Sequence, residues 1–321
     1  MGCSSRIGST AADVGSRSLS CLCLLALLAI PAWGGEAQKP TALPAAASAT
    51  TRGVANAAAS KSRNICAGQP IPAGYVITEW RTTSACGSQG SKPNTMTIKA
   101  YAGLALLDVC AKQTIPAEFV IVAWKNSSAC NAVNTSYNTL TLKSHAGRDL
   151  LDACANQTIP AEFVIVVWKN SSACNAVNTS YNTITLKSHA GRRLLDACAN
   201  QKIPAEFVIV VWKNSGDCNA VNTSYNTVTL KSHAGRDLFD ACANQTIPAE
   251  FVIVVWKNSG DCNAVNTSYN TVTLKSYAGR GSLDICANQQ IPPGYAITGR
   301  RNTSACNAVN SSLNTLTIKK L

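Results

Sequence analysis

Twelve cysteines recur along this 321-residue chain at a spacing that suits disulfide chemistry. Six lie 44 residues apart, and each has a second cysteine 20 residues further on. The first members are Cys66, Cys110, Cys154, Cys198, Cys242 and Cys286, and the second members are Cys86, Cys130, Cys174, Cys218, Cys262 and Cys306. An even set of regularly spaced cysteines is typical of a disulfide framework in an oxidising compartment.

The spacing allows two ways of pairing these cysteines. Pairing across 20 residues, as in Cys154 with Cys174, closes each repeat on itself and leaves no cysteine over. Pairing across 24 residues, as in Cys86 with Cys110, bridges neighbouring repeats and leaves Cys66 and Cys306, which meet only if the array closes into a ring. We favour the pairing within each repeat.

A second recurrent pattern could bind a ligand. A tryptophan followed by a basic residue returns once per repeat, and an aromatic face beside a cation suits stacking on sugars or bases. The candidate binding residues are Trp80, Trp124, Trp168, Trp212 and Trp256 with Lys125, Lys169, Lys213 and Lys257. Lysines near the end of a later strand form another basic row: Lys99, Lys143, Lys187, Lys231, Lys275 and Lys319. The alternative interpretation is that the tryptophans are packing residues at a strand end.

The histidine and aspartate positions of the repeat do not indicate catalysis or metal binding. The histidines are His145, His189 and His233, and tyrosine stands at the same repeat position in Tyr101 and Tyr277. Tyrosine replaces a packing ring more readily than a base or a metal ligand. An Asp two residues before each first cysteine is Asn64 in the first copy, which suits a turn hydrogen bond. We therefore expect no catalytic residues, no metal site and no cofactor, and we do not predict an enzyme.

The N-terminus indicates export. Basic residues precede the apolar run "LSCLCLLALLAIPAW", and small residues follow it, which is typical of a signal peptide over residues 1–37. The run is shorter than a membrane span, so we expect no span after cleavage. Residues 38–63 are rich in Ala, Ser and Thr and predict a flexible linker. We expect a secreted, periplasmic or cell-surface location.

The repeats themselves predict β-structure. "FVIVVWKN" (Phe163–Asn170) is a β-branched and aromatic strand, "YNTITLKS" (Tyr181–Ser188) alternates apolar and polar residues, and we favour a short strand for "LLDAC". We take the strand "FVIVVWKN" as the central one and assign Phe163, Ile165 and Val167 to one of its faces and Val164, Val166 and Trp168 to the other. A strand that is apolar on both faces needs neighbouring repeats to cover it.

We predict a mainly β linear array of six 44-residue disulfide-stapled units, and the alternative is a closed six-bladed propeller-like ring. The terminal strands "YVITEW" and "YAITGR" are more polar than the inner copies, which is typical of capping repeats. The predicted ranges are 64–107 (repeat 1, N-terminal cap), 108–151 (repeat 2), 152–195 (repeat 3), 196–239 (repeat 4), 240–283 (repeat 5) and 284–321 (repeat 6, C-terminal cap).

The first and last repeats resemble a known kind of cysteine-paired unit. "CAGQPIPAGYVIT" with Cys86 and "NTMTIK", and "CANQQIPPGYAIT" with Cys306 and "NTLTIK", resemble a short cysteine-paired unit found in small exported bacterial proteins that are mostly uncharacterised. The inner copies depart from it, with Glu-Phe in place of Gly-Tyr. The resemblance implies a bacterial envelope or secreted setting and brings no activity.

The sequence therefore predicts a secreted or surface-associated protein with a structural or adhesive role. The alternative function is a polysaccharide- or nucleic-acid-binding module that uses the tryptophan and lysine rows. A formal net charge of +12 favours acidic polysaccharide, lipopolysaccharide or another envelope component as partner, and nucleic acid less so.

Overall fold

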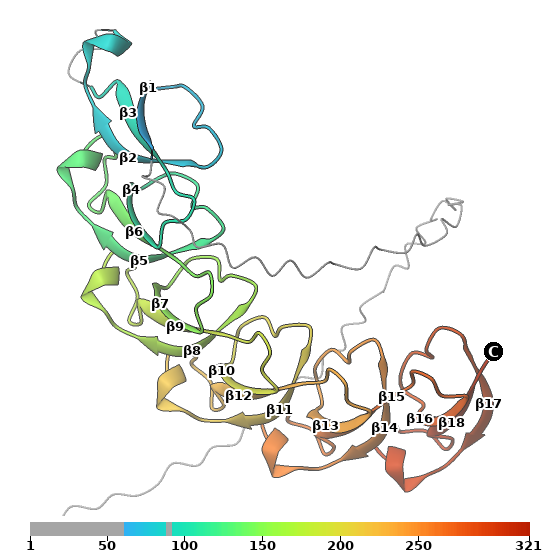
Figure 1. Cartoon of the computed structure of the whole chain (residues 1–321). Coiled ribbons are helices and arrows are strands. Elements are labelled where there is room, and N and C mark those ends of the chain that lie inside the picture. The colour runs from blue at the N-terminus through green and yellow to red at the C-terminus, as the bar shows by residue number, and fades with distance from the viewer. Residues whose placement is uncertain (1–60, 88–91) are drawn as a thin grey trace, which may run out of the picture. The chain divides into compact units, whose positions relative to one another are not determined.

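The computed structural model describes residues 61–87 and 92–321 (Figure 1). The predicted signal peptide, and the predicted linker up to residue 60, lie outside the described residues. Within the described part, eighteen β-strands and six 3-10 turns form six consecutive units, and no other helix is present.

Every unit contains three strands and one 3-10 turn in the same order. The first strands are β1 (Ser62–Cys66), β4 (Leu106–Cys110), β7 (Leu150–Cys154), β10 (Leu194–Cys198), β13 (Leu238–Cys242) and β16 (Ser282–Cys286). The second strands are β2 (Tyr75–Arg81), β5 (Phe119–Lys125), β8 (Phe163–Lys169), β11 (Phe207–Lys213), β14 (Phe251–Lys257) and β17 (Tyr295–Arg301). The 3-10 turns are η1 (Ser84–Cys86), η2 (Ser128–Cys130), η3 (Ser172–Cys174), η4 (Gly216–Cys218), η5 (Gly260–Cys262) and η6 (Ser304–Cys306). The third strands are β3 (Thr95–Ala100), β6 (Thr139–Ser144), β9 (Thr183–Ser188), β12 (Thr227–Ser232), β15 (Thr271–Ser276) and β18 (Thr315–Lys320).

We number the units 1 to 6 by these sheets. Each unit begins two residues before the corresponding predicted repeat, because the strand that carries the first cysteine starts there, as β7 does at Leu150. The short strand favoured for "LLDAC" is confirmed. In unit 1 the strand β1 starts at Ser62, within the last residues of the predicted linker.

Each sheet is antiparallel, and its third strand lies in the middle, as in the order β7-β9-β8. The central place predicted for the apolar strand "FVIVVWKN" is therefore wrong: this second strand is an edge strand, with one side free of strand pairing within its own sheet. An uncovered apolar edge strand favours aggregation. The neighbouring unit provides the cover: in unit 5, Val252 on β14 clusters with Ile285, Leu316 and Ile318 of unit 6.

A β-bulge changes the faces predicted for the second strand. In β8 the register shifts between Ile165 and Val167, so that Val167 lies opposite Thr185 and Trp168 opposite Ile184. Strict alternation is wrong beyond Ile165, because the extra residue reverses the side on which each later side chain lies. Trp168 consequently shares the face of Phe163 and Ile165, and Val167 lies on the opposite face.

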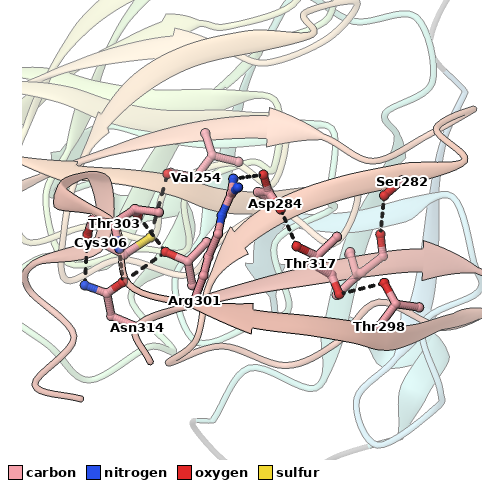
Figure 2. Close-up of polar contacts among 11 residues, drawn as sticks. Val254, Ser282, Asp284, Thr298, Arg301, Thr303, Cys306, Asn314 and Thr317 are labelled. Atoms are coloured by element: carbon pink, nitrogen blue, oxygen red, sulfur yellow. Dashed lines mark hydrogen bonds and ion pairs between the residues drawn. The ribbon is translucent and has the colours of Figure 1, made fainter. Parts of the chain in front are cut away.

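A buried asparagine holds the 3-10 turn beside the third strand. In unit 3, Asn182 accepts a hydrogen bond from the Ser171 N–H at 2.8 Å and donates one to the Ser171 carbonyl at 3.0 Å. Figure 2 shows the equivalent contacts of Asn314 with Thr303 in unit 6. This two-way contact fixes the loop that carries the second cysteine of each unit.

The units follow one another in tandem, with each second strand packed on the first strand of the next unit, from β2 on β4 to β14 on β16, and they do not close into a ring (Figure 1). The linear array is therefore confirmed, and the propeller-like ring is wrong. Apolar burial continues across unit boundaries, with one cluster that includes Leu151, Leu195 and Phe239 from three successive units. At the C-terminal end Ile297 is 39% exposed, whereas the equivalent Ile165 is 9% exposed beneath its neighbour.

Candidate functional site

The six disulfides lie within units. Each joins cysteines 20 residues apart, with Cα atoms 5.3–5.4 Å apart, as the spacing predicts for the within-repeat pairing. The bond links the end of the first strand to the 3-10 turn, for example Cys154 on β7 to Cys174 on η3. In the chain-entropy model a loop of this size stabilises the fold by about 3 kcal/mol. Six such bonds are consistent with an extracellular or otherwise oxidising compartment.

The structure does not bring the tryptophan and the following lysine together as one platform. Consecutive strand residues point to opposite faces, so Trp168 packs against the core while Lys169 lies across from Thr183 on the other face. All five tryptophans are half-buried and contact the apolar clusters. The side of each tryptophan ring that faces the core is therefore a packing surface, and only part of each ring reaches solvent.

The lysines that follow the tryptophans form ion pairs within their own unit. Lys169 Nζ lies 2.7 Å from Asp152 Oδ1, and the pairs Lys125–Asp108, Lys213–Asp196 and Lys257–Asp240 repeat this contact at 3.2, 2.7 and 2.6 Å. In unit 6 Arg301 takes the lysine position beside Asp284, which also accepts a hydrogen bond from Thr317 (Figure 2).

These contacts change the acidity of the paired aspartates. Partial burial alone raises the pKa of Asp152, but hydrogen bonds from Lys169 and Thr185 and the nearby lysine charges outweigh it, so the pKa lies below its ordinary value. The same causes lower the pKa of Asp196 and Asp240. Each of the four lysines thus lies beside a carboxylate on the protein surface.

The outer surface of the tryptophan rows lines grooves between loops of successive units. One groove, of about 940 Å³, contains Trp212, Asn222 and Tyr225 of unit 4 together with Asn244 and Asn266 of unit 5. The next, of about 840 Å³, contains Trp256 and Tyr269 of unit 5 and Asn288 of unit 6.

These two grooves are continuous, because Asn244 and Asn266 line both. Neither is lined by any Lys, Arg, Asp or Glu. The Trp256 indole nitrogen is buried without a hydrogen-bond partner among the described residues, so this side chain offers its ring rather than a donor. The arrangement provides aromatic faces, amide groups and hydroxyls at the period of the repeat.

The histidine positions are packing positions between units. His145 of unit 2 lies edge-on to Phe163 of unit 3, with ring centroids 5.7 Å apart, and its Nε2 lies 2.9 Å from the Ala117 carbonyl. Its Nδ1 lies 2.7 Å from a carboxylate oxygen of Glu162. Tyr277 packs in the same way on Tyr295 and donates to the Ala249 carbonyl. Both side chains pack edge-on against an aromatic ring of the next unit and contact a backbone carbonyl, which explains why tyrosine and histidine can replace each other at this position.

Sequence reasoning missed the glutamines that join the units. The Ile121 N–H on the outer edge of β5 donates to Gln157 Oε1 at 2.8 Å, and Gln157 Nε2 donates to the Ile121 carbonyl at 2.9 Å and the Cys154 carbonyl at 2.6 Å. Five unit boundaries have this contact, made by Gln113, Gln157, Gln201, Gln245 and Gln289. A signal was present, because glutamine stands three residues after the first cysteine in every repeat.

Groups of three or more His, Cys, Asp or Glu side chains that could hold a metal ion are not found across 61–87 and 92–321. The same segments contain no helix with the length and apolar character needed to cross a bilayer.

Comparison with known proteins gives no relative from which a role could be inferred. No protein-family model, no curated protein and no solved structure matches this chain.

Proposed function

We propose that this chain is a secreted or surface-associated adhesive repeat protein that binds a neutral polysaccharide along the grooves between its units. The observation that carries this proposal is the continuous uncharged groove over units 4 to 6, lined by Trp212, Tyr225, Trp256 and Tyr269 with asparagines between them.

The groove chemistry matches a sugar chain. Aromatic rings present a flat apolar face to the C–H face of a sugar ring, and amide side chains both donate to and accept from hydroxyl groups. A groove that continues from one unit to the next suits a linear polymer better than a compact small molecule. Repetition of weak subsites along one chain also raises the overall affinity through effective concentration.

The polyanionic partners suggested by the net charge would have to bind on the face opposite the aromatic grooves, where the lysines lie. Acidic polysaccharide, lipopolysaccharide and nucleic acid depend on unpaired cations. On that face Lys143 and Lys187 have no ion pair within the described residues, whereas Lys125, Lys169, Lys213 and Lys257 are each paired with an aspartate. The grooves that contain the aromatic residues hold no cation. Neutral polysaccharide is therefore the better match.

Affinity electrophoresis tests this proposal. The full chain should be retarded in gels that contain a neutral glucan, mannan or xylan, and the variant Tyr225→Ala/Tyr269→Ala should lose most of the retardation. The matched control is Leu313→Ala, since Leu313 is the exposed unit-6 counterpart of these tyrosines. Retardation by heparin or single-stranded DNA alone, or equal behaviour of the tyrosine variant and the parent, would contradict the proposal.

A further inference from the structure

A row of exposed leucines lies on the face opposite the aromatic grooves. Leu106, Leu150, Leu194 and Leu238 each begin the first strand of units 2 to 5, and they are 54–60% exposed. Leu150 lies across from Lys187 of β9, on the same face as Asp152. A leucine exposed once is ordinary, but four at one structural position form a row that calls for a partner.

The row is confined to the inner units. In units 1 and 6 the equivalent residues are Ser62 and Ser282, each across from a lysine as in the inner units. The leucine row is therefore centred on the boundary between units 3 and 4, with two leucines on either side. A row with such a centre can match itself after a two-fold rotation.

The central boundary is hollowed on this face, as is the boundary between units 1 and 2. A groove of about 620 Å³ lies between units 3 and 4, lined by Leu150 and Lys187 from unit 3 and by Leu194, Lys213 and Asp217 from unit 4. Lys187 and Asp217 line this groove without forming an ion pair with each other.

The charges beside the row differ between its two halves. Units 4 and 5 carry Asp217 and Asp261 in the 3-10 turn, and no ion pair joins either to another described residue. Units 2 and 3 have Ala129 and Ala173 at the same position, and their Lys143 and Lys187 have no ion pair within the described residues. One half therefore presents unpaired lysines alone, and the other adds unpaired carboxylates.

We propose that two copies of this chain pair antiparallel through the leucine row. Unit 3 of one copy then faces unit 4 of the other, and unit 2 faces unit 5. This orientation places Leu150 near the partner copy's Leu194 position and brings Lys187 and Lys143 toward the positions of Asp217 and Asp261. The serines of units 1 and 6 face one another at both ends of the interface.

Charge complementarity selects this partner. A parallel pairing places the two halves that carry unpaired lysines alone against each other, which costs repulsion, whereas the antiparallel pairing brings each of them to the half that also carries unpaired carboxylates. A soluble polyanion gains nothing from four half-exposed leucines, and an anionic bilayer meets the carboxylates of units 4 and 5. The proposal concerns the face opposite the aromatic grooves and is independent of polysaccharide binding.

Charge reversal with sedimentation velocity tests the pairing on the full disulfide-bonded chain. The parent should be a dimer. The variants Asp217→Lys/Asp261→Lys and Lys143→Glu/Lys187→Glu should each be monomers. In a dimer of two identical variant chains, positions 217 and 261 of one copy would face positions 187 and 143 of the other with the same sign of charge. An equimolar mixture of the two variants should form a heterodimer, since both contact regions are then complementary, and the chain that combines all four changes should dimerise again.

A leucine variant with serine at all four positions should also be a monomer, with a dimer dissociation constant raised at least about tenfold. Serine occurs at this position in units 1 and 6, so the fold accommodates it, and six intact disulfides by mass spectrometry verify this. Leu313→Ser, which removes an exposed leucine outside the row, should leave the dimer intact.

A monomeric parent overturns the proposal, including one that sediments with vesicles of phosphatidylglycerol and phosphatidylcholine. Dimerisation by either charge variant alone overturns the antiparallel pairing, and so does a mixture of the two variants that remains monomeric.

Discussion

Removing one inter-unit glutamine should loosen one boundary of the array and leave the rest in place. In Gln157→Ala the three hydrogen bonds of the side chain are lost, two of them to Ile121 of the preceding unit. A hydrogen bond of this kind contributes about 1 kcal/mol net. Gln157 is half-buried, so water replaces part of the loss, and we expect the boundary to be destabilised by about 2 kcal/mol.

Amide hydrogen exchange measures this effect at one atom. The Ile121 N–H lies on the outer edge of β5, and Gln157 Oε1 is its acceptor. A loss of about 2 kcal/mol corresponds to about thirtyfold faster exchange of this amide where exchange follows local opening. In Gln157→Glu the effect should be at least as large, because a carboxylate cannot donate to the two carbonyls that the amide contacts.

The chain provides a matched control. Gln69 stands at the same position in unit 1, is exposed and has no preceding unit to bind. Gln69→Ala should therefore change stability by less than about 0.5 kcal/mol. Unchanged exchange of the Ile121 amide in Gln157→Ala, or an equal loss of stability in Gln69→Ala, would refute the role assigned to these glutamines.

Three further predictions concern the array, its disulfides and its charges. Deleting Cys198–Ala241 preserves the spacing and should give a soluble, shorter protein, whereas deletion from Cys286 onward uncovers β14 and should cause aggregation or dimerisation by light scattering; equal behaviour of the two would mean independent units. Reduction should lower the denaturant midpoint sharply, as each disulfide contributes about 3 kcal/mol, and a reduced chain with unchanged unfolding would contradict this. The lowered pKa values of Asp152, Asp196 and Asp240 contribute stability that is present above the unfolded value near 3.9 and is lost as pH falls through the folded values. The denaturant midpoint should thus fall between about pH 5 and pH 3, less steeply in the triple Asp→Asn variant, and an identical slope would refute the assignment.

The repeat architecture could be predicted because its signals are periodic. The spacings of 44 and 20 residues indicated the unit and its disulfide, and the alternation in "YNTITLKS" indicated a strand with one apolar face, which the structure has from Thr183 to Ser188. The polar substitutions in "YAITGR" indicated a C-terminal cap, and Ile297 at this open edge is indeed more exposed than its inner counterparts. The strand "YVITEW" is not an outer edge of the array, because unit 2 covers it and Ile77 is only 7% exposed.

The β-bulge and the order of the strands in each sheet could not be predicted from the sequence. A β-bulge inserts one residue without any glycine or proline to mark it, so the face of Trp168 could not be assigned from alternation. The sequence also does not show which strand is central, since "FVIVVWK" is apolar on both faces for a reason outside its own sheet: the next unit covers it.

The candidate site depended on contacts between units. The pairing of Trp with the adjacent Lys as one platform required both side chains on one face, which a strand does not allow. The groove residues Asn222, Tyr225 and Asn244 come from loops of two units, 22 positions apart at the extremes, and only stacking brings them together. Polar loop residues of this kind are ordinary turn formers until the structure shows what they line.

The most direct test of polysaccharide binding is its salt dependence, followed through the fluorescence of the groove tryptophans. Neutral polysaccharide should change the emission of the full chain, with the same affinity at low salt and at about 0.5 M salt, because the aromatic grooves contain no charged side chain. Emission that responds only to heparin or nucleic acid, with an affinity that falls steeply as salt rises, would contradict the account.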